Sequence, residues 1–173
     1  GMDDYRNPVM NLKLGKDNVN KFLKLIGNAY ADVMIIKGLN ARTSFGVDYR
    51  GGYYRAVDPK WDEADGAGRS EKLNYVRNDQ NHFLEYQWTN QLNFSRTFDK
   101  HALDAVGGVE FTKAESEGFY ARKNGLLLEN LDYGYLDVAT GDQITEAKGS
   151  GDEYSLFSYF AKANYAYDSK YLL

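Results

Sequence analysis

The segment from Phe83 to Phe98 alternates between apolar and polar side chains almost residue by residue. A period of two over this length predicts a β-strand with one apolar and one polar face. The run is much longer than the usual strand of about 5–6 residues. The apolar positions are Leu84, Tyr86, Trp88, Leu92, Phe94 and Phe98, and the polar positions are Glu85, Gln87, Thr89, Gln91, Asn93, Ser95 and Thr97. What the chain folds into depends on whether this apolar face meets a protein core or lipid.

The same alternation recurs in four other segments, at about 25–36, 39–50, 103–112 and 157–167. It is cleanest from Leu39 to Arg50 and is blurred in 25–36, where both faces carry apolar residues. The run from Lys170 to Leu173 resembles the first residues of a further strand, cut off early. We therefore predict an all-β fold, an antiparallel meander of about five full strands and the start of a sixth.

The connections between these strands fall into two classes by length. Tight turns are expected at Lys37-Gly38, at Asp99-Lys100 and at 168–170, because turn-forming residues gather there. Long loops are expected near 51–81 and 113–153. In a meander, alternate connections lie at opposite ends, so all the short turns share one end. Outer-membrane barrels show this asymmetry, whereas long structureless loops are uncommon in compact domains.

Composition argues against several classes of protein, among them nucleic-acid-binding, disulfide-bonded and helical membrane proteins. The 173 residues carry a net charge of −4 and no cysteine, which argues against nucleic-acid binding and excludes disulfides and thiolate metal sites. Mean hydropathy is −0.62, and no window approaches the roughly 18 apolar residues that a membrane helix needs. Barrel strands need no such window, because every second position is polar. The 15 tyrosines and 17 glycines suit an all-β chain.

Aromatic side chains gather near both ends of the apolar faces, with small residues between them. Two aromatic girdles of this kind mark the membrane interfaces of barrel proteins. We therefore predict a lipid-facing and a lumen-facing set. The lipid-facing residues are Phe45, Val47, Tyr86, Trp88, Leu92, Phe94, Phe157, Tyr159, Tyr165 and Tyr167. The lumen-facing residues are Arg42, Asp48, Arg50, Glu85, Gln87, Gln91 and Asn93.

Several ordered motifs resemble barrel segments of SusC/RagA-type TonB-dependent transporters. The resemblance extends from about Asn7 to Leu173 and is weakest in the two long loops. Its motifs are Asn7-Pro8-Val9-Met10, Gly27-Asn28-Ala29-Tyr30, Ile36-Lys37-Gly38-Leu39, Thr43-Ser44-Phe45-Gly46-Val47-Asp48-Tyr49, Phe98-Asp99-Lys100-His101-Ala102-Leu103 and the run 158–173.

The resemblance implies a 22-stranded outer-membrane barrel of a Gram-negative bacterium that imports large nutrients, typically glycans or peptides. It implies five partners: a plug domain of the same full-length chain, the TonB complex, a SusD-like surface lipoprotein lid, the transported glycan or peptide, and membrane lipid. No plug-like segment is visible, so we expect an internal slice of the barrel. Residues 1–20 would be an external lead-in and residues 21–173 the barrel portion.

No constellation in the sequence favours an enzyme, a cofactor or a metal site. His82 and His101 are the only histidines and lack partners at ligand spacing. Asp62, Glu63 and Asp65 lack the remaining ligands of a calcium loop, so ion binding there stays open beside a solvated acidic loop. Glu129 and Asp132 lie in a long loop, without the rigid cleft that a glycosidase pair requires.

The aromatic residues assigned to the long loops are the candidate ligand contacts. Planar rings beside polar groups stack on sugars, although the same rings also pack loops together. These residues are Tyr53, Tyr54, Trp61, Tyr120, Tyr133 and Tyr135. The alternative to a transporter segment is a soluble, secreted β-sheet module that binds a carbohydrate-like ligand through its long loops.

Overall fold

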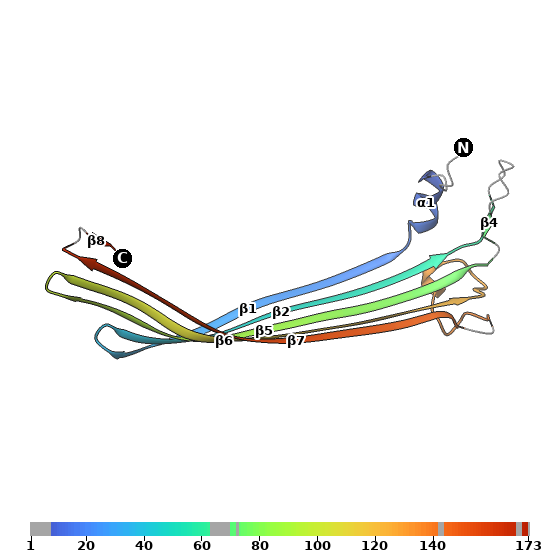
Figure 1. Cartoon of the computed structure of the whole chain (residues 1–173). Helices are drawn as coiled ribbons and strands as arrows, with labels where there is room; N and C mark the ends of the chain where they lie inside the picture. Colours follow the sequence, from blue (N-terminus) through green and yellow to red (C-terminus); the bar gives the residue numbers. More distant parts are fainter. Residues whose placement is uncertain (1–7, 63–69, 72, 142–143, 169–170, 173) are drawn as a thin grey trace, which may run out of the picture. The chain divides into compact units, whose positions relative to one another are not determined.

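The structure is a computed structural model that describes residues 8–62, 70–71, 73–141, 144–168 and 171–172. Five long strands and one short strand form a sheet in the order β1-β2-β5-β6-β7-β8 (Figure 1), and β3 pairs with β4 in a separate small sheet. The elements are α1 (Pro8–Gly15), β1 (Val19–Ile36), β2 (Leu39–Asp58), β3 (Trp61–Asp62), β4 (Ser70–Glu71), β5 (Tyr75–Phe98), β6 (His101–Asn124), the 3-10 helix η1 (Leu131–Tyr133), β7 (Ile144–Tyr167) and β8 (Tyr171–Leu172).

The predicted all-β antiparallel fold is confirmed, with the six strands in the expected order. The short strand β8 pairs antiparallel with β7, so that Tyr167 lies opposite Tyr171. The one α-helix of the described residues, α1, lies within the stretch expected to be a lead-in, and the sequence did not predict it. None of the described helices is long and apolar enough to span a membrane.

The strands extend well beyond the segments that alternate in hydropathy, so the predicted long loops near 51–81 and 113–153 were too long. Residues 51–58 belong to β2, 75–81 to β5, 113–124 to β6 and 144–153 to β7. In these extensions polar and aromatic residues occupy both faces, so the hydropathy period disappears although the strands continue. Three aromatic residues assigned to loops, Tyr53, Tyr54 and Tyr120, consequently lie on strands.

The chain divides into two compact units. The loop unit contains the described residues of 1–23, 51–82 and 117–151, and the turn unit those of 24–50, 83–116 and 152–173. The long connections all belong to the loop unit, and the tight turns all belong to the turn unit. The sorting of the connections that the sequence indicated is therefore present in the structure.

The turn between β1 and β2 requires glycine. Gly38 has a φ of 89°, in the left-handed region that side chains other than glycine rarely adopt. A Cβ atom at this position would lie 2.7 Å from the carbonyl oxygen of Ser95, and the Ser95 amide donates a 2.8 Å hydrogen bond to the Gly38 carbonyl. Gly38 therefore both closes the turn and holds it against β5.

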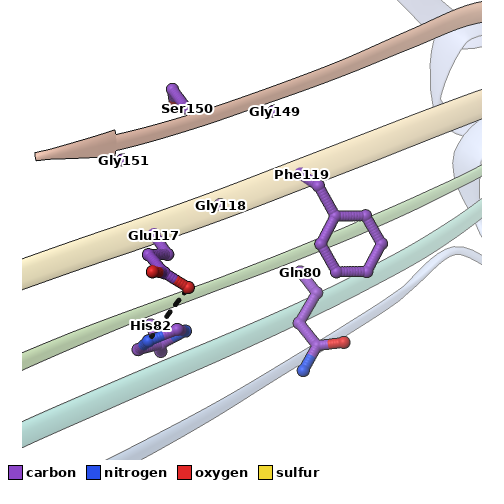
Figure 2. A pocket seen from close by; sticks show the side chains of 8 residues that line it. All are labelled: Gln80, His82, Glu117, Gly118, Phe119, Gly149, Ser150 and Gly151. Carbon is purple, nitrogen blue, oxygen red and sulfur yellow. Dashed lines mark ion pairs between the residues drawn. The ribbon is translucent and has the colours of Figure 1, made fainter.

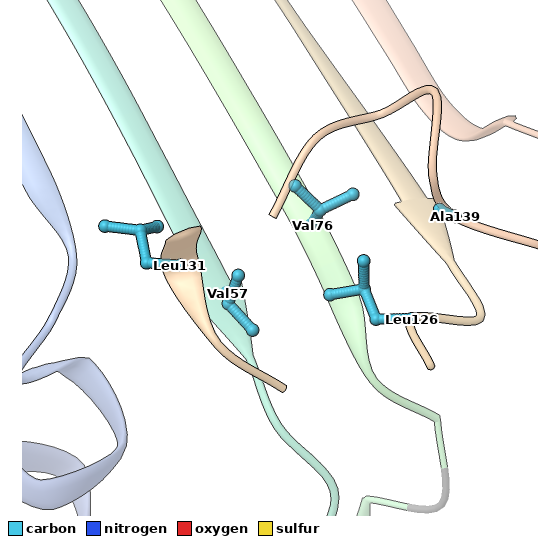
Figure 3. Close-up of a cluster of buried hydrophobic side chains, with 5 residues drawn as sticks. All are labelled: Val57, Val76, Leu126, Leu131 and Ala139. Atoms are coloured by element: carbon cyan, nitrogen blue, oxygen red, sulfur yellow. The ribbon is translucent and has the colours of Figure 1, made fainter. Parts of the chain in front are cut away.

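The cluster of buried hydrophobic side chains among the described residues is small and lies in the loop unit. Val57 of β2 and Val76 of β5 are covered by Leu126, Leu131 and Ala139, which come from the connection between β6 and β7 (Figure 3). Val19 and Leu136 pack against this cluster. The connection thus folds back over one face of β2 and β5, where it removes Val57 and Val76 from water.

Backbone hydrogen bonds close the base of this connection, and a buried asparagine fixes it to the sheet. Thr140 N–H donates to the Gly125 carbonyl at 2.8 Å, and Gly141 N–H donates to the Asn124 carbonyl at 3.1 Å. The Asn74 side chain accepts from Leu126 N–H and donates to the Leu126 carbonyl, each at 2.8 Å. Residues 125–141 are therefore an Ω-loop, a compact loop whose two ends meet.

Candidate ligand-facing site

One face of the loop unit carries a group of aromatic and charged side chains from neighbouring strands, which we call the aromatic–basic cluster. Alternation along each strand puts its members on the face opposite Val57 and Val76. The members are Tyr54 of β2, Tyr75, Arg77 and Asp79 of β5, Tyr120 and Arg122 of β6, and Glu146 and Lys148 of β7.

Arg77 is at the centre of the cluster. Its guanidinium group donates to both carboxylate oxygens of Asp79, at 2.7 and 2.8 Å, and lies 4.7 Å from the centre of the Tyr120 ring. The hydrogen bonds to Asp79 raise the pKa of Arg77 further, and Tyr54 adds a smaller electrostatic contribution. Arg77 thus makes a two-bond contact with a carboxylate and lies over a ring, and these two contacts suit arginine better than lysine.

Glu146 and Lys148 continue the cluster onto β7. The Tyr120 hydroxyl donates to Glu146 at 2.6 Å, and the Lys148 ammonium lies 2.7 Å from the same Glu146 oxygen. The hydrogen bond from Lys148, followed by that from Tyr120, lowers the pKa of Glu146 below its ordinary value. In turn, the hydrogen bond to Glu146 raises the pKa of Lys148. Glu146 is therefore a carboxylate, and Lys148 an ammonium, at neutral pH.

A second cation–ring contact lies beside the first. The Arg122 guanidinium carbon is 3.6 Å from the centre of the Tyr75 ring, and the buried Arg122 Nε has no hydrogen-bond partner. Cations over aromatic faces are attracted by the ring quadrupole. The cluster thus presents planar rings, cations and carboxylates on one surface, and it can bind sugar rings and hydroxyls or the charged and aromatic groups of peptides.

The six aromatic residues predicted to contact ligand are not brought together. Tyr54 and Tyr120 belong to the aromatic–basic cluster, whereas Tyr53 alternates with Tyr54 and so lies on the other face of β2. Tyr135 stacks on Arg55, with 4.4 Å from the guanidinium carbon to the ring centre, and Tyr133 is in η1 of the Ω-loop. Trp61 is in β3, which pairs with β4.

Sequence reasoning missed six members of the cluster and placed them in the long loops: Tyr75, Arg77, Asp79, Arg122, Glu146 and Lys148. A signal was available. Tyr75, Arg77 and Asp79 are two residues apart, as are Tyr120 and Arg122, which is the spacing of one strand face. Extending the period of two without requiring apolar residues would have grouped them.

In the turn unit, most of the predicted lumen-facing residues make polar contacts with side chains on the same strand or on the adjacent strand, and Glu85 of β5 contacts a side chain of β7, two strands away. Gln87 is exposed. Their assignment to a lumen stays a prediction. The contacts are Arg42 with Asp32, Arg50 with Asp48, Tyr154 with Glu85, and Gln91 with Asn93, at closest distances of 2.6, 2.5, 2.8 and 3.0 Å.

The predicted lipid-facing residues form a largely exposed apolar surface in the turn unit. Phe45 and Tyr86 stack with ring centres 6.2 Å apart, and Trp88 donates to the Thr43 hydroxyl at 2.9 Å. Tyr159 is 79% exposed and packs edge-to-face on Phe157. Leu92 and Tyr167 are exposed, whereas Val47, Phe94 and Tyr165 are half-buried. That these residues meet lipid stays a prediction.

The remaining candidates for chemistry have structural contacts. His101 Nδ1 lies 2.6 Å from the Tyr165 hydroxyl. Glu129 accepts hydrogen bonds from Lys60 N–H and from the Asn74 side chain, both at 3.0 Å, and so joins the two long connections. Of the candidate calcium loop, Glu63 and Asp65 lie outside the described residues, and Asp62 is in β3. Among the described residues, no group of three or more His, Asp or Glu residues could hold a metal ion.

Comparison with known proteins gives relatives in sequence and in fold. No protein-family model matches the chain. TonB-dependent receptor P3 of Formosa agariphila is 29% identical over 146 residues, covering 84% of this chain and 14% of the receptor. TonB-dependent receptor P39 of the same organism is 28% identical over 173 residues, covering 96% of this chain and 16% of the receptor. The chain therefore spans about one-sixth or less of the length of these relatives.

Solved structures agree with these relatives. The fold matches a RagAB peptide transporter with a TM-score of 0.78 at 22% identity, over 91% of this chain and 17% of that one. A structure of the RagAB peptide importer in an open-open state matches with a TM-score of 0.74, also at 22% identity, over 88% of this chain and 17% of that one. The resemblance to SusC/RagA-type TonB-dependent transporters is therefore confirmed, and this chain has the fold of a segment of their barrel.

Proposed function

We propose that this chain is part of the barrel wall of a TonB-dependent transporter that imports large nutrients, glycans or peptides, across the outer membrane of a Gram-negative bacterium. The names of its sequence relatives and the RagAB fold support this function. Both groups of relatives are named as receptors or transporters, and we propose no catalytic role for the chain. The partners would be a plug domain of the full-length chain, TonB, a SusD-like surface lipoprotein lid and membrane lipid.

The aromatic–basic cluster is the observation that best supports a role for this segment in contacting the transported solute. Along β5, Arg77 and Asp79 occupy the same alternate positions as Glu85 and Gln87, which are expected to face the lumen. Along β6, Tyr120 and Arg122 occupy the same alternate positions as Asp104 and Glu110, which accept hydrogen bonds from Ser95 and Thr89 of the polar face of β5. The cluster would therefore line the lumen and contact the solute.

Replacement of Tyr120 in the full-length transporter tests this role. Tyr120→Ala removes the ring under Arg77 and the hydroxyl that holds Glu146, so we expect solute affinity to fall about tenfold, which is about 1.4 kcal/mol. The probes are a fluorescent casein digest and a fluorescent dextran hydrolysate, and their binding and uptake are measured in cells that lack the native gene.

Tyr133→Ala is the matched control, because Tyr133 is a 58% exposed tyrosine in the Ω-loop that covers the opposite face. It should leave affinity for the probe unchanged. Equal affinities for Tyr120→Ala and the wild type would overturn the role of the cluster. If cells that carry the native gene take up neither probe, just like cells that lack it, the result argues against import of these two nutrient classes.

A further inference from the structure

A groove lies on the face of the loop unit opposite the aromatic–basic cluster. It has a volume of about 490 Å³, within the range of small-molecule sites, and strands β5, β6 and β7 form it (Figure 2). Apart from Ser150, the side chains that line it alternate with members of the cluster, which sets it apart from the proposed solute path. Its lining residues are Gln80, His82, Glu117, Gly118, Phe119, Gly149, Ser150 and Gly151.

Two glycines on β7 keep the groove open. Gly149 and Gly151 are two residues apart and so share a face of the strand. Gly149 has no positive φ, and a Cβ atom there would meet only ordinary contacts, 3.6 Å from the Gly118 carbonyl oxygen and 3.8 Å from Phe119 Cβ. The backbone therefore does not require glycine at 149. Glycine inside a strand weakens it, and it marks a bulge, a bend, or a site where a ligand or another backbone approaches closely.

The polar groups in the groove keep free hydrogen-bonding capacity. His82 Nε2 and Glu117 Oε2 point toward each other but are 3.9 Å apart, too far for a hydrogen bond (Figure 2). The Glu117 side chain is 72% exposed. A carboxylate accepts several hydrogen bonds, and the Gln80 amide both donates and accepts. These groups match the hydroxyls of a polyol.

An aromatic ring stands beside these polar groups. Phe119 is 56% exposed, and Figure 2 shows its ring next to Gln80. A flat apolar ring beside a carboxylate and an amide suits a pyranose, which has an apolar face and a rim of hydroxyls. Among the lining residues there is no Lys or Arg, and Glu117 repels anions. Phosphate, sulfate and uronic acids are therefore disfavoured.

We propose that this groove binds a neutral saccharide on the side of the sheet facing away from the aromatic–basic cluster. The sugar is either free or the headgroup of a glycolipid, because both present the same hydroxyls and ring face. The site is separate from the proposed import function and does not depend on it.

Saturation-transfer NMR on the detergent-purified, full-length transporter tests the proposal. The probes are the methyl glycosides of glucose, mannose and galactose, with methyl glucuronide as the anionic counterpart. At least one neutral glycoside should bind, and its signal should fall at least fivefold in Gly149→Leu, which fills the groove. Phe119→Ala, which removes an exposed ring, should give a similar loss without any added bulk. Methyl glucuronide should bind at least fivefold more weakly than its neutral counterpart.

Ser158→Leu is the matched control, because it adds the same side chain to β7 at a position that does not line the groove. It should leave the glycoside signal unchanged. The proposal is overturned if no neutral glycoside binds the wild type, if Phe119→Ala and Gly149→Leu bind as the wild type does, or if methyl glucuronide binds equally well. Competition by monogalactosyl diacylglycerol in nanodiscs supports a glycolipid source, and the absence of competition supports a free sugar.

Discussion

Glu146 is the residue whose ionisation reports most directly on the aromatic–basic cluster. Its carboxylate takes hydrogen bonds from Lys148 and Tyr120, which lower its pKa. Because the folded pKa is lowered, the stabilisation from these bonds is present above the unfolded pKa of the glutamate and is lost as pH falls through the folded value. The cluster is therefore complete at neutral pH and loses its β7 contacts in acid.

Lys148→Gln should raise the pKa of Glu146, because the largest cause of its lowering is removed. The titration midpoint is measured from the ¹³C-carboxyl resonance, assigned by its loss in Glu146→Gln. Tyr120→Phe should raise the midpoint less, since the tyrosine hydroxyl is the second cause. An unchanged midpoint in Lys148→Gln would show that the two side chains do not interact in solution.

At the scale of elements, the β1–β2 turn depends on one residue. Gly38→Ala should lower the stability of the folded barrel by about 1–2 kcal/mol, the usual cost of a left-handed conformation for a residue with a side chain. The clash with the Ser95 carbonyl adds to this cost. Stability is measured by the temperature at which the full-length barrel loses its heat-resistant mobility on a gel.

Gly46→Ala is the control for this turn. A Cβ atom at Gly46 would lie 3.5 Å from the Asn28 side chain, an ordinary contact, and Gly46 does not have a positive φ. We expect little change or a slight gain in stability, because alanine limits the unfolded chain. Equal losses for Gly38→Ala and Gly46→Ala would contradict the account of the turn.

The Ω-loop also depends on a single residue, Asn74, whose side chain fixes it to the sheet and which is 3% exposed. Asn74→Leu leaves Leu126 N–H and the Leu126 carbonyl without their side-chain partner, at about 1–3 kcal/mol for each buried unpaired group. We expect faster amide hydrogen exchange in residues 125–141. Asn130→Ala removes only an exposed cap, which accepts from Asp132 N–H, and should change exchange much less.

Predictability differs between elements for a physical reason. The turn unit was predicted well because its strands carry apolar residues at alternate positions, as the run from Leu39 to Tyr49 shows. The strand extensions around Arg77 and Tyr120 were missed because polar side chains occupy both faces there. Helix α1 was missed because Pro8–Gly15 is short and has no acidic residue in its first turn.

For the candidate site, residue type was a better guide than position. Tyr54 and Tyr120 were named as ligand contacts from their chemistry, and both belong to the aromatic–basic cluster. Their partners Arg77 and Glu146 were not named, because the contact between β5, β6 and β7 depends on strand register. Register is set by pairing across strands far apart in sequence, which one segment read alone does not reveal.

At the scale of the whole molecule, the long strands that the structure describes expose apolar side chains. Trp88, Leu92, Phe157 and Tyr159 are each at least 50% exposed. The 173-residue chain, expressed alone, should aggregate in water and become monodisperse in detergent, since open strand edges and apolar faces pair with other copies. Light scattering during gel filtration measures this. A monodisperse monomer without detergent would favour the soluble-module alternative.

Because the base of the Ω-loop is closed by hydrogen bonds, the length of the loop can change without altering the arrangement of the strands that flank it. The chain leaves the sheet at Asn124 and Gly125. On its return, Gly141 hydrogen-bonds to Asn124 and Thr140 hydrogen-bonds to Gly125. Whatever sequence lies between residues 125 and 140, the same two backbone hydrogen bonds join the two ends of the loop. Leu127, at 84% exposure, marks a position where residues can be inserted without changing these hydrogen bonds. The sequence and length of the Ω-loop can therefore vary while the strands that flank it stay the same.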